Sequence, residues 1–193
     1  MSQLQKWIVG AYSASPTRFD WVPEEEEEFL RGIYRIPTLR GLEIPFTGTL
    51  HKFDEDWFLE RIPKYLDVVI TLIPATTAAV RENVEFGLAS TNEGGRQQAI
   101  QLVKDATAAI ARINKALGRQ AVIAVEIHTA PGGSDVLALS NSLTALSALD
   151  WQGAKIVIEH CDAKVVDQKA EKGYMSLSDE IAAIRHSRLD IGV

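Results

Sequence analysis

The fold of this chain is best predicted from one apolar stretch, QAVIAVEIHTAP, at residues 120–131. A helical pattern comes before it, at about residues 91–117, where apolar side chains recur every three or four positions. Gly118 is well placed to end that helix. The stretch itself alternates apolar and polar side chains toward its end, which is typical of a strand with two different faces. A helix followed directly by such a strand indicates a protein built from βα units.

The same alternation of strands and helices runs along the whole chain. We predict strands at 6–13, 39–48, 67–76, 120–131 and 154–163, with the beginning of a sixth at 189–193. Helices are predicted at 22–34, 54–63, 91–117, 135–149 and 176–186. This rhythm implies parallel pairing with right-handed crossovers, so the fold class is α/β, either an open doubly wound sheet or a (β/α) TIM-type barrel.

Missing motifs favour the barrel. No strand opens into a Gly-x-Gly-x-x-Gly turn, and no phosphate-binding Gly-x-x-x-x-Gly-Lys-Ser/Thr loop is present, so no nucleotide cofactor is expected. A complete barrel takes about 250 residues. We therefore expect residues 1–193 to form a single partial barrel domain, truncated to about five βα units and the start of a sixth strand.

Composition limits the partners. A formal net charge of -6 and the lack of a Lys/Arg block argue against nucleic acid and anionic membranes. Cys161 is the single cysteine, so no intrachain disulfide can form, and residues 1–16 lack the features of a signal peptide. No segment reaches the roughly 18 apolar residues of a membrane span. We expect a cytoplasmic protein that acts on a small molecule.

Three glutamates lie near the ends of different predicted strands. Glu43, Glu126 and Glu159 fall on the strand face opposite the apolar one, and His128 shares that face. Barrel active sites are built at the carboxyl ends of strands. Converging carboxylates require protonation, a basic partner or a cation, and with His128 they suit Mn, Zn, Co or Mg. The same carboxylates could move a proton next to a carbonyl group.

Each candidate also has a structural interpretation. Glu43 could instead be salt-bridged to Arg40 or to another arginine, and His128 could be a buried structural histidine. Cys161 is expected to be a small buried filler rather than a ligand. Asp162 could cap a loop or contact substrate.

Three other parts of the sequence bear on the binding of a ligand. His51 follows the second strand on a loop, where contact with a ligand and simple exposure are equally consistent with the sequence. The run EEEEE at 24–28 is interpreted as a solvated helix start. The PGGSD loop at 131–135 could hold an anion or form an ordinary turn and helix cap.

Seven segments, in order, resemble an uncharacterised bacterial domain-of-unknown-function family within the xylose-isomerase-like TIM barrels. They are WIVGAYSASP, GLEIPFTGTLH, DWFL, FGLAS, GRQAVIAVEIHTAP, DWQGAKIVIEHCDA and SLSDEIAAIR. That superfamily includes sugar isomerases, ketose epimerases, inosose dehydratases and apurinic endonucleases, and commonly binds a divalent metal. The resemblance implies that Glu159 is a metal ligand and acid/base, with further ligands on sixth to eighth strands that this chain does not contain.

These observations lead to a functional hypothesis. The full-length relative is expected to be a metal-dependent isomerase or epimerase of a small sugar or polyol, while this chain alone is expected to be inactive and to associate through exposed barrel edges. The expected roles are catalysis by Glu159 and Glu126, metal binding by Glu159 and His128, and substrate binding by Glu43, His51, His128 and Asp162. The alternative is a protein that binds a sugar or other polar ligand without chemistry, so the sequence leaves open whether the chain is an enzyme.

Overall fold

A computed structural model describes residues 5–130, 135–161, 175–187 and 189–193. The strands are β1 (Trp7–Val9), β2 (Leu39–Pro45), β3 (Asp67–Thr71), β4 (Val122–Ile127) and β5 (Lys155–Ile158). The helices are the 3-10 turn η1 (Tyr12–Ala14), α1 (Pro23–Tyr34), α2 (Glu55–Arg61), α3 (Ile73–Glu82), α4 (Glu93–Leu117), α5 (Val136–Leu146) and α6 (Leu177–Ser187). The predicted α/β class with alternating strands and helices is confirmed.

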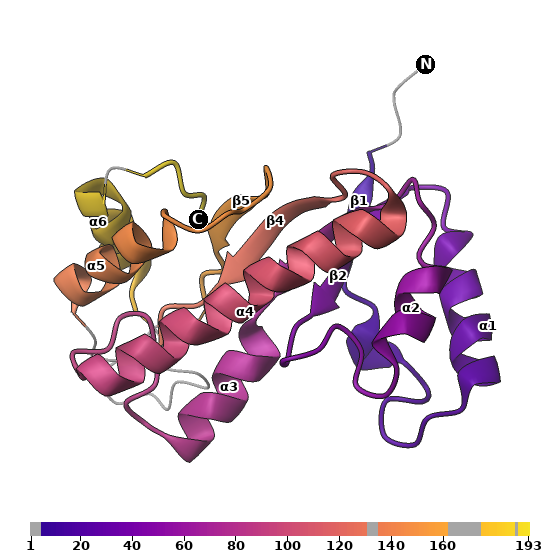
Figure 1. The fold of residues 1–193 in the computed structure, drawn as a ribbon, viewed down its shortest axis with the longest axis horizontal. Coiled ribbons are helices and arrows are strands. Elements are labelled where there is room, and N and C mark those ends of the chain that lie inside the picture. Colours follow the sequence, from indigo (N-terminus) through magenta and orange to yellow (C-terminus); the bar gives the residue numbers. More distant parts are fainter. Residues whose placement is uncertain (1–4, 131–134, 162–174, 188) are drawn as a thin grey trace.

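The five strands form one parallel sheet in the order β1-β2-β3-β4-β5. Each strand is added beside the one before it, without the reversal of order that defines a doubly wound sheet. Helix α4 runs diagonally across the molecule, with α1 and α2 toward one end and α5 and α6 toward the other (Figure 1). Parallel pairing brings all the strand carboxyl ends to the same edge.

The predicted start of a sixth strand also pairs with the sheet. Gly192 forms a parallel bridge with Val157. The N–H of Ile158 donates to the Gly192 carbonyl at 2.8 Å, and the N–H of Gly192 donates to the Ile156 carbonyl at 3.1 Å. The chain therefore returns beside β5, on the side where the next strand of a sequential sheet would lie.

All five predicted strands are shorter in the structure, and in two of them residues predicted as strand belong to a helix. The predicted strand 67–76 ends at Thr71, because Pro74 lies in the first turn of α3, where a proline is tolerated. The predicted strand 6–13 ends at Val9, and its last residues belong to η1. Continuous apolar runs hid both changes, since a short buried strand and a buried helix start have similar compositions.

Helix boundaries followed the capping signals closely. Asn92 caps α4 by accepting from the Gly95 N–H at 2.9 Å, and Gly118 ends it in the left-handed conformation with φ of 71°. Asp135 caps α5 through the Ala138 N–H at 2.8 Å. Of the loop at 131–135, residues 131–134 lie outside the described residues, so its anion-binding interpretation stays a prediction.

One face of the sheet is buried against the helices. Its side chains are Leu42, Ile44, Val68, Ile70, Val125, Ile127, Ile156 and Ile158. They pack in one cluster with the apolar stripe of α4, which includes Ile100, Val103, Ile110 and Ile113. Strict alternation with Val125 and Ile127 would also place Ile123 on this face, but Ile123 is only partly buried. A register shift opposite Val68 and Val69 passes over Ile123, and Val122 takes the buried position instead.

None of the helices in the part of the chain that the structure describes combines the length and apolar character needed to cross a bilayer.

Candidate functional site

The register of the sheet determines which side chains share the face opposite the core. Glu43 pairs with Val69, and Thr71 pairs with Glu126, which in turn pairs with Val157. Paired residues in neighbouring parallel strands point to the same side. The Glu159 N–H donates to the Ile127 carbonyl at 3.0 Å, so the ladder continues by one residue past β5. Glu43, Glu126 and Glu159 therefore project from one face, as the sequence predicted.

The three glutamates interact electrostatically. Burial is the largest cause, followed by the charges of Glu43 and Glu159, and together they raise the pKa of Glu126 to about 7. Burial also raises the pKa of Glu43, against the opposing effect of a hydrogen bond from Tyr12. A carboxyl with a pKa near 7 exists in both protonation states at neutral pH, which is the property required of a general acid or base.

Tyr12 of η1 was not among the predicted site residues. Its side chain hydrogen-bonds to Glu43, and burial, followed by the Glu43 charge, raises the Tyr12 pKa to about 12. The phenol therefore stays neutral, and its O–H donates a hydrogen bond to the Glu43 carboxylate. The sequence pattern does not reveal Tyr12, because residues 6–13 read as one continuous strand, whereas the chain leaves β1 at Val9 and forms η1.

Glu159 is held by side chains from two other strands. The Thr71 hydroxyl donates to Glu159 Oε2 at 3.4 Å, and His128 Nε2 lies 3.3 Å from the same oxygen. The imidazole of His128 is fully buried, whereas 39% of the Glu159 side chain is exposed. On its other side, His128 Nδ1 lies 3.9 Å from Cys161 Sγ. His128 thus orients a carboxylate that remains accessible to a ligand.

The described residues bring few metal ligands together at Glu159. His128 and Glu159 supply two adjacent donors, but nowhere in 5–130, 135–161, 175–187 and 189–193 do three or more His, Cys, Asp or Glu side chains converge as metal ligands. Catalytic metal centres usually use at least three protein ligands. The described residues by themselves do not fit a closed metal site.

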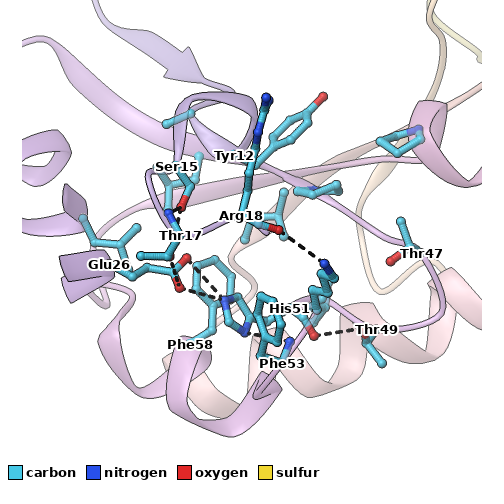
Figure 2. A pocket seen from close by; sticks show the side chains of 18 of the residues that line it. Tyr12, Ser15, Thr17, Arg18, Glu26, Thr47, Thr49, His51, Phe53 and Phe58 are labelled. Carbon is cyan, nitrogen blue, oxygen red and sulfur yellow. Dashed lines mark hydrogen bonds and ion pairs between the residues drawn. The ribbon is translucent and has the colours of Figure 1, made fainter. Parts of the chain in front are cut away.

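Glu26 and His51 form a second polar cluster, on the other side of β2. Glu26 lies in the acidic run at the start of α1, yet it is buried, with 8% of its surface exposed. Both carboxylate oxygens lie 3.3 Å from His51 Nε2, and the Thr17 hydroxyl donates to Oε2 at 3.2 Å (Figure 2). The interpretation of the whole run as a solvated helix start is wrong for Glu26. Its position on the inner side of α1 was the available signal.

The tautomer of His51 follows from its neighbours. Nδ1 accepts hydrogen bonds from the backbone N–H of Asp54 at 2.9 Å and of Phe53 at 3.4 Å, so it carries no proton. The proton is therefore on Nε2 and is donated to Glu26. The ring stacks on Phe58, with centroids 5.4 Å apart. A hydrogen bond from His51 to a ligand would require one of these bonds to break.

A cavity of about 310 Å³ connects the two clusters. Tyr12 and Glu43 line one part of it, and Glu26 and His51 line another. Figure 2 shows the side chains of Tyr12, Glu26, His51 and Phe53 around the same hollow. The cavity therefore adjoins the strand-end glutamates through Glu43.

Other predicted residues have simple positions. Arg40 pairs with Asp67 at 2.9 Å and is therefore not the salt-bridge partner of Glu43. Glu43 is hydrogen-bonded by Tyr12 instead. His160 faces away from Glu159 and pairs with the buried Glu180 of α6 at 2.8 Å. Cys161 is partly buried. Asp162 lies outside the described residues.

The fold and site define an α/β protein whose parallel sheet presents a carboxylate and histidine cluster at the carboxyl ends of its strands. The chain belongs to the family described as Domain of unknown function (DUF4862), whose model matches residues 8–193. It is similar to an uncharacterised protein of Salmonella typhimurium, STM3670, with 34% identity over 186 residues. That match covers 92% of this chain and 58% of the Salmonella protein, so the chain spans little more than half of its relative. The predicted membership of a domain-of-unknown-function family is confirmed.

Proposed function

We propose that the chain is the N-terminal part of a xylose-isomerase-like TIM barrel, whose longer form isomerises or epimerises a small sugar or polyol. The sequential parallel order of the strands supports the barrel, since each βα unit of a barrel adds a strand on the same side. The bridge at Gly192 continues that order beyond β5.

The observation that carries the proposed reaction is the convergence of Glu43, Glu126 and Glu159 on one face at the strand ends. The proposed route runs through an enediolate, in which a base removes a proton from the carbon next to a carbonyl and the proton is later returned. Glu159 is the proposed base, because its carboxylate is accessible and oriented by Thr71 and His128. Glu126, which is partly protonated at neutral pH, is the proposed acid that donates a proton to the substrate carbonyl oxygen.

The remaining residues are proposed to bind the substrate. Glu43, held by Tyr12, would accept hydrogen bonds from sugar hydroxyl groups. His128 and Asp162 are proposed to complete the polar lining. His51 would contribute its ring face, since both of its nitrogens are engaged within the chain.

A divalent cation belongs to the proposal for the longer protein only. His128 and Glu159 would be two of its ligands, and the part of the relative beyond this chain would have to supply the others. A bound cation would stabilise negative charge on the substrate oxygens. For this chain alone, we propose that it is inactive.

The experiment is proton exchange catalysed by the longer Salmonella relative in deuterated water. A panel of aldoses and ketoses is incubated with the protein, and NMR detects deuterium at the carbon next to the carbonyl. Gln at the position that aligns with Glu159 or Glu126 should slow exchange by about 10²- to 10⁴-fold, the usual contribution of a general acid or base. Gln at the position aligned with the exposed Glu25 is the control.

A second proposal is binding without chemistry, which the cavity beside Glu43 supports. Stabilisation of the Salmonella protein by a sugar in metal-free buffer, with no deuterium incorporated from any sugar of the panel, would establish binding and contradict the isomerase proposal.

A further inference from the structure

The cavity beside Glu43 has two chemically different parts. One part carries the polar groups of Tyr12 and Glu43, which also belong to the carboxylate cluster. The other part is lined mainly by apolar side chains from α1, β2, the loop after β2 and α2, among them Phe29, Leu30 and Phe58. A ligand that fills the cavity must match both parts.

Three polar residues of the lining, Thr17, Glu26 and His51, are hydrogen-bonded to one another or to the backbone. Glu26 accepts from Thr17 and from His51, and Nδ1 of His51 accepts from the backbone. A sugar hydroxyl placed beside Glu26 and His51 would lose its hydrogen bonds to water and would have to displace one of these internal bonds to gain another. An apolar group loses nothing on entry and gains from leaving water.

The volume fits a compact ring. A dry apolar cavity of about 150 Å³ is known to bind benzene. The cavity of about 310 Å³ has space for a substituted aromatic ring whose hydroxyl groups lie beside Tyr12 and Glu43.

We propose that the cavity is a binding compartment for an aromatic or similarly compact apolar substituent, so that the ligand is a sugar or polyol that carries such a group. The substituent occupies the space between Leu30 and Phe58, and the hydroxylated part reaches Tyr12 and Glu43. This inference names the substrate class for the proposed function and rests on it for the reaction, but the binding step can be measured without turnover.

The test compares phenyl β-D-glucoside with methyl β-D-glucoside as probes, using this chain and isothermal titration calorimetry. Phenyl glucoside should bind at least about tenfold more tightly, the ratio expected from burying a ring. Leu30→Phe fills the cavity and should abolish the preference. Val84→Phe adds the same ring at a site that is 72% exposed and outside the cavity, so it should leave the preference unchanged.

A second variant can be used if Leu30→Phe does not fold. Should Leu30→Phe fail to give the wild-type circular dichroism spectrum, Thr47→Phe at the exposed rim of the cavity replaces it and should also reduce the preference. Equal binding of the two glucosides by the wild-type chain, or a preference that survives filling of the cavity, overturns the inference.

The two proposals fail separately. A phenyl preference in this chain without deuterium exchange in the longer relative would leave the compartment intact and reject the isomerase. Deuterium exchange on unsubstituted sugars by the longer relative, with no phenyl preference in this chain, would support the isomerase proposal and reject the binding compartment.

Discussion

Both carboxylate oxygens of Glu26 lie 3.3 Å from Nε2 of His51. Glu26 belongs to the acidic run at the start of α1, and His51 lies in the loop after β2. The side chains of both residues are about nine-tenths buried. This pair joins two segments that are 25 residues apart. It also forms part of the wall of the cavity next to the strand-end glutamates.

Removing this carboxylate should destabilise the fold. Glu26→Ala leaves the Nε2 proton of His51 and the Thr17 hydroxyl without their shared acceptor, so the free energy of unfolding should fall by about 2 kcal/mol. Urea denaturation followed by circular dichroism measures the change. Glu24→Ala, in the exposed part of the same run, should change stability by less than about 0.5 kcal/mol. Equal effects of the two substitutions would show that the Glu26 bonds contribute nothing.

The raised pKa of Glu126 should make stability depend on pH. Its pKa rises from 4.5 in the unfolded chain to about 7 in the folded one, so the folded state binds more protons between these values. The free energy of unfolding therefore falls as the pH rises from about 4.5 to about 7 and is constant above that range, as far as Glu126 contributes.

Glu126→Gln should remove this contribution. At pH 8 the variant is expected to be more stable than the wild type by about 1 kcal/mol, a modest value because water screens a half-buried carboxyl. At pH 4.5 the two proteins should be equally stable. Urea denaturation at both pH values measures the difference, and the same gain at each pH would contradict the raised pKa.

Gly41 should not tolerate a side chain. A Cβ atom at this position would overlap the backbone carbonyl of Asp67 on the neighbouring strand β3, so Gly41→Ala must push β2 and β3 apart. We expect a loss of at least about 2 kcal/mol in the free energy of unfolding. Gly32→Ala is the matched control in α1, where nothing lies within 4 Å, and it should stabilise by about 0.5–1 kcal/mol. Similar stabilities for the two variants would show that β2 and β3 are not so close.

Metal removal should distinguish this chain from its longer relative. Two donors, His128 and Glu159, should hold Mn, Zn or Mg too weakly to survive native mass spectrometry, so EDTA should leave the melting temperature of this chain unchanged. The Salmonella protein should retain one metal and lose it when the residue aligned with Glu159 becomes Gln. Retention of a metal by this chain would contradict the first expectation.

The same spectra report the oligomeric state. Among the described residues, β1 pairs with β2 alone, which leaves one strand edge available. We therefore expect this chain to form dimers through this edge. The substitution Ile8→Pro should dissociate them, because proline removes a backbone N–H from the edge strand. A monomer at micromolar concentration would reject association through this edge.

Much of the strand-end site could be predicted from local pattern. Alternation in β2 and β4 placed Glu43, Glu126 and His128 on one face, because successive strand side chains point to opposite sides whatever surrounds them. Where the ladder shifts register, at Ile123, the same rule failed, since a bulge depends on the neighbouring strand.

The sequence by itself determined the βα order, the helix caps at Asn92 and Gly118, and the polar face of the sheet, because each depends on periodicity or on side chains a few residues apart. Only the tertiary structure decided that Glu26 is buried, that Tyr12 donates to Glu43, and that one cavity is lined by both Glu26 and Glu43. The physical reason is that burial and hydrogen bonding of these groups depend on partners from other elements. Their sequence positions alone do not fix those distances.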